Sequence, residues 1–169
     1  MRKAKAALGS LLFLVVAPGV VAGVVPWWLT NWRLREPLPH WLPLRLAGWL
    51  LIAAGTIVLL HAFARFVVEG LGTPAPVAPT ANLVVGGVYR YVRNPIYLAV
   101  TATIVGQALA LGQPFLLLYA AAFLAAAVAF VRGYEEPTLR RQFGEQYEAY
   151  RRAVPGWLPR RKRPVSDRP

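Results

Sequence analysis

Cysteine, histidine and charged residues are all scarce in this 169-residue chain. Without cysteine, the chain can form no disulfide, offer no thiol nucleophile and build no cysteine-ligated zinc or iron–sulfur centre. Its two histidines, His40 and His61, do not form a spaced pair of metal ligands. His61 lies inside an apolar run, where a packed or hydrogen-bonded role is more typical than metal ligation. Most metal and nucleophile chemistries are thereby excluded.

Charged residues make up 15% of the chain, yet the net charge is +12. An average soluble domain is about one-quarter charged, so the few charges here must be segregated. Residues 6–32, 46–64 and 94–131 contain none, and these stretches are 27, 19 and 38 residues long. Roughly 20 apolar residues suffice to cross a bilayer. The length fits one domain, and the pattern excludes a soluble one.

We predict one all-α integral membrane domain over residues 1–169, with four transmembrane helices. The first run exceeds a signal-peptide core and lacks a clear A-x-A site, so we expect a retained helix with a bend at Pro18-Gly19. The third run is too long for one crossing, and Gly112-Gln113-Pro114 divides it into a hairpin. The predicted helices are about 6–29, 44–68, 96–111 and 114–131.

The basic residues predict the orientation of these helices. Alternate sides of the predicted topology carry sixteen and three lysines and arginines. The positive-inside rule therefore places both termini, the loop 69–95 and the tail 132–169 in the cytoplasm of a multi-pass cell-membrane protein. Motifs in the loop and in the tail would then face each other.

The loop changes character along its length. Pro74, Pro76 and Pro79 indicate an extended connector, and Gly86-Gly87 permits a tight turn. Tyrosines and arginines then precede Asn94, a candidate N-cap, and Pro95, which suits a first helical position. Free N–H groups at this helix start suit an anionic group. The alternative is an ordinary interfacial girdle.

The tail predicts a C-terminal amphipathic helix. Leu139, Phe143, Tyr147 and Tyr150 form one apolar stripe that could lie on anionic lipid. Glu135-Glu136 is different, because adjacent carboxylates at the mouth of a membrane helix are costly unless solvated or partnered, for example by a cationic ligand. The basic run 160–163 favours lipid headgroups over nucleic acid.

The two segments "GVYRYVRNPIYLA" and "EEPTLRRQFGEQYEAYRRAVP" are similar in order and spacing to motifs of one enzyme group. The chain resembles the superfamily of isoprenylcysteine carboxyl methyltransferases and phospholipid N-methyltransferases, which are integral-membrane enzymes. The resemblance covers roughly residues 83–159. Asn94 replaces the usual histidine and Ala99 the usual glycine, so no imidazole is present there as an acid or base.

This resemblance implies a site for S-adenosylmethionine between the loop, the last hairpin and the tail. Arg132 lies close to where the family places an arginine for a substrate carboxylate, and Glu136 belongs to the acidic motif, so these two are the catalytic candidates. The implied cofactor contacts are Leu83, Val84, Tyr89, Asn94, Pro95, Ile96, Tyr97 and Glu135.

The expected function is methyl transfer from S-adenosylmethionine to a lipophilic acceptor at the cytoplasmic membrane face. Tyrosine faces and carboxylates suit a sulfonium cation, and in-line displacement needs positioning more than acid–base groups. The acceptor is either the carboxylate of an isoprenylcysteine-like compound or a lipid amine. The scarcity of bases favours the carboxylate. The alternatives are an NADPH-dependent membrane reductase of related fold and a non-catalytic scaffold or transporter subunit. The expected partners are membrane lipids and a small lipophilic substrate, with no nucleic acid.

Overall fold

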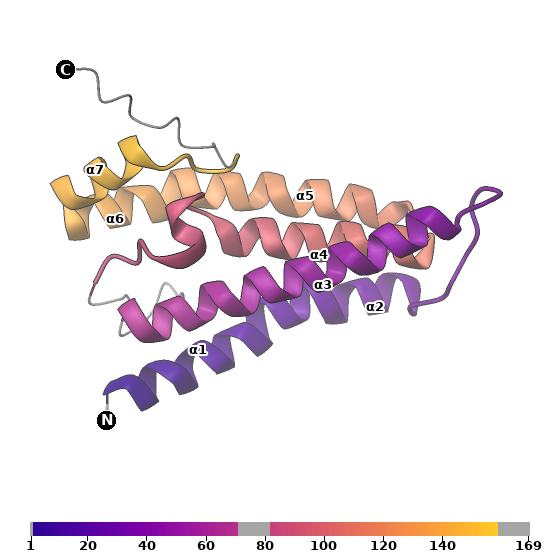
Figure 1. Cartoon of the computed structure of the whole chain (residues 1–169), viewed down its shortest axis with the longest axis horizontal. Helices are drawn as coiled ribbons and strands as arrows, with labels where there is room; N and C mark the ends of the chain where they lie inside the picture. The colour runs from indigo at the N-terminus through magenta and orange to yellow at the C-terminus, as the bar shows by residue number, and fades with distance from the viewer. Residues whose placement is uncertain (1, 71–81, 159–169) are drawn as a thin grey trace, which may run out of the picture.

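The computed structural model describes residues 2–70 and 82–158, and every regular element in that part of the chain is helical (Figure 1). The helices are α1 (Arg2–Gly19), α2 (Val25–Thr30), α3 (Leu42–Arg65), α4 (Pro95–Leu111), α5 (Phe115–Phe130), α6 (Glu136–Phe143) and α7 (Glu145–Ala153). The π turns are Val20–Val24, Phe66–Gly70 and Val131–Glu135, and Gly87–Arg90 is a 3₁₀ turn. The predicted all-α fold is confirmed. The loop prolines and the basic run 160–163 lie outside the described residues.

The long helices run side by side along one axis (Figure 1). The start of α1, the segment before α4, and α6 with α7 gather at one end of this bundle, while the α2–α3 and α4–α5 connections lie at the other. The loop and the tail therefore meet, as the sequence predicts.

Three helical stretches of the described chain are long and apolar enough to cross a membrane, where the sequence predicts four. They are Leu11–Thr30, Leu42–Glu69 and Phe115–Phe143. The fourth candidate, α4, is apolar but has only 17 residues. It is the central helix, because Val100, Ile104 and Ala108 form the main core with Leu116 and Ala120 of α5.

Glycines allow α3 and α4 to pack in close contact. A Cβ atom on Gly55 would lie 2.9 Å from the carbonyl oxygen of Ala99, and one on Gly106 would lie 2.8 Å from the carbonyl oxygen of Gly48. Helix α5 is also rich in small residues, but many of its alanines are exposed, including Ala121 and Ala122. The glycines of α3 and α4 therefore bring these two backbones together.

The first membrane helix contains a π turn directly after Pro18-Gly19, where the sequence predicts a bend. Pro26 has no N–H to donate to Ala22, four residues earlier. The side chain of Gln107 replaces that donor, with its Nε2 2.6 Å from the oxygen of Ala22. The Tyr119 hydroxyl likewise donates to Val21 at 2.9 Å. Donors from α4 and α5 thus satisfy the irregular backbone.

The C-terminal part differs from the prediction in two ways. Helix α5 does not end at residue 131 but continues through the π turn into α6, as one helical stretch to Phe143. The predicted single amphipathic helix is then broken at Gly144, whose φ of 53° and ψ of −126° favour glycine. Because of this break, α7 can turn back toward the loop before α4.

The α3–α4 packing predicts a penalty for a single methyl group at Gly55. We expect Gly55→Ala to lower the free energy of unfolding by about 1–3 kcal/mol, because the new Cβ would press on the backbone of α4. Thermal unfolding in detergent measures the change. Gly23→Ala is the matched control, since a Cβ there meets nothing within 4 Å. Equal melting temperatures for both variants would contradict this account of the packing.

Candidate functional site

A cavity of about 380 Å³ lies at the end of the bundle where the loop and the tail meet. Its volume falls within the roughly 300–1,000 Å³ typical of small-molecule sites. The cavity reaches from Tyr147 and Tyr150 of α7 to Val100 and Phe123, which lie deeper along α4 and α5. Phe13, Ala17 and Val21 of the first membrane helix line it as well. Polar groups therefore concentrate toward the tail, and apolar groups toward the bundle.

The structure brings nine of the ten predicted site residues to the wall of this cavity. They are Leu83, Val84, Tyr89, Asn94, Pro95, Ile96, Tyr97, Glu135 and Glu136. Arg132 is the exception: it lies on the π turn before Glu135 and is exposed, outside the cavity lining. Nine of the residues that the resemblance implies therefore line one cavity, and Arg132 does not.

Each of the three π turns contributes to the cavity wall. Val21 comes from the first, Phe66 from the second, and Val131, Tyr134 and Glu135 from the third. A π turn inserts one residue into a helix and so shifts the side chains that follow it to another face, and such turns are frequent at functional sites. The turn Val131–Glu135 ends at the first of the two glutamates, and Glu136 follows it directly.

Glu135 bonds to the first turn of α4. The Tyr97 hydroxyl donates to Glu135 Oε1 at 2.5 Å, across 38 residues of sequence. Both residues line the cavity. Glu135 is also only partly buried. A carboxylate next to a tyrosine ring in a largely apolar cavity suits a cationic ligand.

Tyr89 presents a buried hydroxyl that, within the described residues, has no hydrogen-bond partner. The side chain is 5% exposed and lines the cavity. Burial raises the pKa of Tyr89 well above its usual value, so the hydroxyl stays protonated as a neutral donor. An unsatisfied buried hydroxyl costs about 1–3 kcal/mol. A ligand with an acceptor atom would offset that cost.

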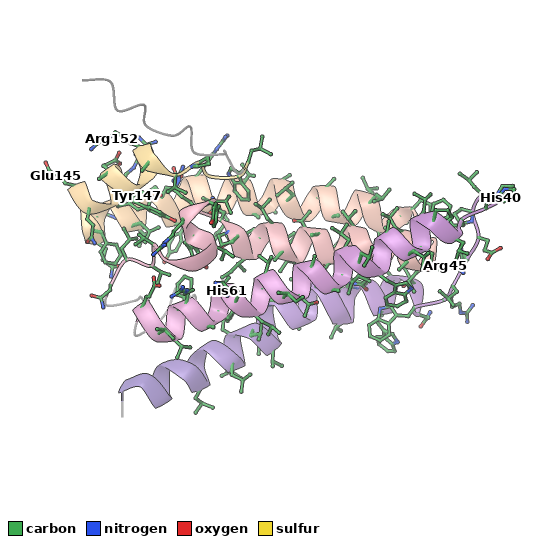
Figure 2. All side chains as sticks on the ribbon, in the orientation of Figure 1. His40, Arg45, His61, Glu145, Tyr147 and Arg152 are labelled. Atoms are coloured by element: carbon green, nitrogen blue, oxygen red, sulfur yellow. The ribbon has the colours of Figure 1, made fainter. Side chains whose placement is uncertain are left out.

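Arg93 contacts Glu136 and several groups of the tail. Its Nη1 lies 2.7 Å from Glu136 Oε1 and donates to the Tyr147 hydroxyl at 2.9 Å. Burial is the main reason that the pKa of Tyr147 is raised, and the charge of Glu136 adds to it. Figure 2 shows Tyr147 on the side of α7 toward the loop, with Glu145 at its outer end. Glu136 is thus an ion-pair partner within the protein.

Asn94 precedes α4 as predicted, but its side chain does not cap the helix. Its Nδ2 instead donates to the carbonyl oxygen of Gly156 at 3.0 Å. Asn94 thus occupies the N-cap position as predicted, but without a capping bond from its side chain, because the amide is turned toward the tail. Pro95 does occupy the first position of α4, as predicted.

Sequence reasoning did not assign Arg93, Tyr147 or Tyr150 to the site. Tyr150 donates to the carbonyl oxygen of Tyr89 at 2.7 Å, and burial raises the pKa of Tyr150 so that this donor persists. All three residues belong to the two motifs that carry the resemblance. That shared membership is the signal that could have identified them.

The orphaned hydroxyl predicts an unusual pair of stability effects. We expect Tyr89→Phe to raise the melting temperature of the ligand-free protein, because it removes a buried group without a partner. Tyr150→Phe should lower it, since the bond to Tyr89 is lost. Differential scanning fluorimetry in detergent compares both with the unchanged chain. A lower melting temperature for Tyr89→Phe would show that its hydroxyl has a partner.

The comparisons with known proteins agree with this architecture. The model of the phospholipid methyltransferase family matches residues 44–146, more than half of the chain. The match begins in α3, contains α4, α5 and both glutamates, and ends at the start of α7. No curated protein and no solved structure gives a significant match. The helical membrane architecture, the cavity between loop and tail, and this match together show that the chain belongs to the phospholipid methyltransferase family.

Proposed function

We propose that the chain is an S-adenosylmethionine-dependent methyltransferase that acts on a lipid amine at the cytoplasmic face of the membrane. In this proposal α4 is the fourth crossing, and the loop, the tail and both termini are cytoplasmic, as the distribution of basic residues indicates. The observation that carries the proposal is the cavity in which Tyr89, Tyr97 and Glu135 converge from the loop, from α4 and from the π turn.

The residues of the cavity fit the proposed cofactor. Glu135 and the ring of Tyr97 suit a cation, and the buried Tyr89 hydroxyl suits an acceptor oxygen or nitrogen. S-adenosylmethionine would supply a methyl group on a sulfonium for direct displacement by the acceptor's lone pair. The task of the protein is then alignment, which can supply several kcal/mol of the barrier. Tyr97 orients Glu135, and the apolar walls exclude water.

The charges of the cavity favour an amine over a carboxylate acceptor. Among the described residues that line it, Arg93 is the one cation, and it is paired with Glu136. Arg132, the residue considered for a substrate carboxylate, is exposed outside the lining and has no role in this proposal. A carboxylate acceptor would therefore bring an uncompensated negative charge beside Glu135. An amine reacts as the neutral base, after losing a proton to water or to Glu135.

A binding experiment tests the proposed cofactor site. We expect purified protein to bind S-adenosylhomocysteine in isothermal titration calorimetry. Glu135→Gln and Tyr97→Phe should each weaken binding roughly 10-fold, because the first removes the negative charge offered to the ligand and the second removes the hydroxyl that orients Glu135. Glu145→Gln is the matched control, because Glu145 is exposed and outside the cavity lining. Wild-type affinity in both Glu135→Gln and Tyr97→Phe would show that these two residues are not part of the cofactor site.

The same titration separates the alternatives. A membrane reductase of related fold would bind NADPH in competition with S-adenosylhomocysteine, and a scaffold would bind neither. The proposed function predicts that NADPH leaves the S-adenosylhomocysteine isotherm unchanged.

A labelled-methyl experiment tests the acceptor. Membranes with the protein are incubated with S-adenosylmethionine carrying a radioactive methyl group, and the lipid fraction is then treated with base. Methyl esters release volatile methanol under these conditions, whereas N-methyl groups stay with the headgroup. We expect base-stable label in the lipid fraction, reduced in Glu135→Gln and retained in Glu145→Gln. Label released mostly as methanol would favour the carboxylate acceptor.

A further inference from the structure

Arg93 is positioned to hold the chain after α7. Besides its bonds to Glu136 and Tyr147, its Nε donates to the carbonyl oxygen of Val154 at 3.0 Å. Its own backbone N–H donates to Pro155 at 2.9 Å. The side chain of Arg93 is only 13% exposed and that of Glu136 18%. One partly buried guanidinium therefore links the loop, α6, α7 and the segment after α7.

The segment Val154–Trp157, which we call the strap, lies along the start of α4. The backbone N–H and the side-chain amide of Asn94 both donate to the carbonyl oxygen of Gly156, at 3.2 and 3.0 Å. The ring of Trp157 lies 6.2 Å from the ring of Tyr97. The strap thus contacts all three residues of the range 93–97 that have polar or aromatic side chains, which are Arg93, Asn94 and Tyr97.

The adjacent glutamates have different partners. Glu135 bonds to Tyr97, a residue of the cavity wall, whereas Glu136 bonds to Arg93. From this difference we propose that Arg93 and Glu136 are a positioning pair, which holds the strap over the first turn of α4 and so aligns Tyr97 with Glu135. This inference rests on the proposed function, and it places Glu136 outside the groups that touch substrate. Glu135 is then the carboxylate that meets the cofactor.

The chemistry of the pair predicts a cost for replacing either member. Removing one member of a partly buried ion pair leaves the other charge without a partner. Lysine at position 93 would keep the charge near Glu136, but its ammonium lacks the planar fork that reaches Glu136, Tyr147 and Val154 together. Arg93→Lys should therefore be intermediate between the unchanged chain and Arg93→Gln.

A single spin label measures the strap without any ligand. The chain has no cysteine, and Leu158 directly after the strap is 79% exposed, so Leu158→Cys provides one labelling site. We expect Arg93→Gln and Glu136→Gln to increase the mobility of a nitroxide there, seen by electron paramagnetic resonance in detergent. Arg93→Lys should give a smaller increase. Glu135→Gln and the exposed control Glu145→Gln should give none.

The second measurement is S-adenosylhomocysteine affinity in the same variants. Arg93→Gln and Glu136→Gln should each weaken binding roughly 10- to 100-fold, as expected for breaking a charged hydrogen-bonded pair. Because both substitutions break the same pair, the fold-loss of affinity in the double variant should be smaller than the product of the two single fold-losses. Glu135→Gln should weaken binding while the label stays immobile. Unchanged mobility and affinity in Arg93→Gln and Arg93→Lys would overturn the positioning role.

The two measurements separate this inference from the proposed function. If Arg93→Gln releases the strap but the protein binds no S-adenosylhomocysteine, the proposed cofactor is refuted. The role of the Arg93–Glu136 pair in holding the strap would still be supported. Full cofactor affinity in the variants with a released strap would refute the inference and leave the proposed function standing.

Discussion

Close packing of α4 against α3 is the constraint on which the site depends. Gly48, Gly55 and Gly106 leave no room for a side chain between the two backbones. This contact places the first turn of α4 beside the end of α3, where Ala62 packs with Val84 and Tyr89. Glu69 accepts a bond from the Gly86 N–H at 2.9 Å and also pairs with Arg65. The loop that enters α4 is thereby held by the helix before it.

Departures from α-helical geometry then form the cavity. A membrane provides no water for unpaired backbone groups, so an irregular turn must find donors in neighbouring helices. Gln107 and Tyr119 supply such donors to the first π turn. The third π turn ends at Glu135, and the break at Gly144 lets α7 return over the loop. One of these departures, the π turn Val131–Glu135, also places Glu135 next to Tyr97.

The helices could be predicted because they follow from local signals. Uncharged runs and the Gly112–Pro114 break located α3, α4 and α5 to within a few residues, apart from the continuation of α5 into α6. The motif resemblance suggested the candidate site residues, nine of which line the cavity. The pairing of Arg93 with Glu136 was not predictable, because they are 43 residues apart and meet only after the tail reverses. The first π turn likewise depends on tertiary partners, which are Gln107 and Tyr119.

The central claim is that the loop, α4 and the π turn before α6 form one cofactor cavity, with Glu135 facing the ligand and Glu136 facing Arg93. An experimental structure of the protein with S-adenosylhomocysteine tests this most directly. The account predicts ligand density in contact with Tyr89, Tyr97 and Glu135, with the Arg93–Glu136 pair intact. Ligand density elsewhere on the protein, or Glu136 in contact with the ligand and separated from Arg93, would contradict it.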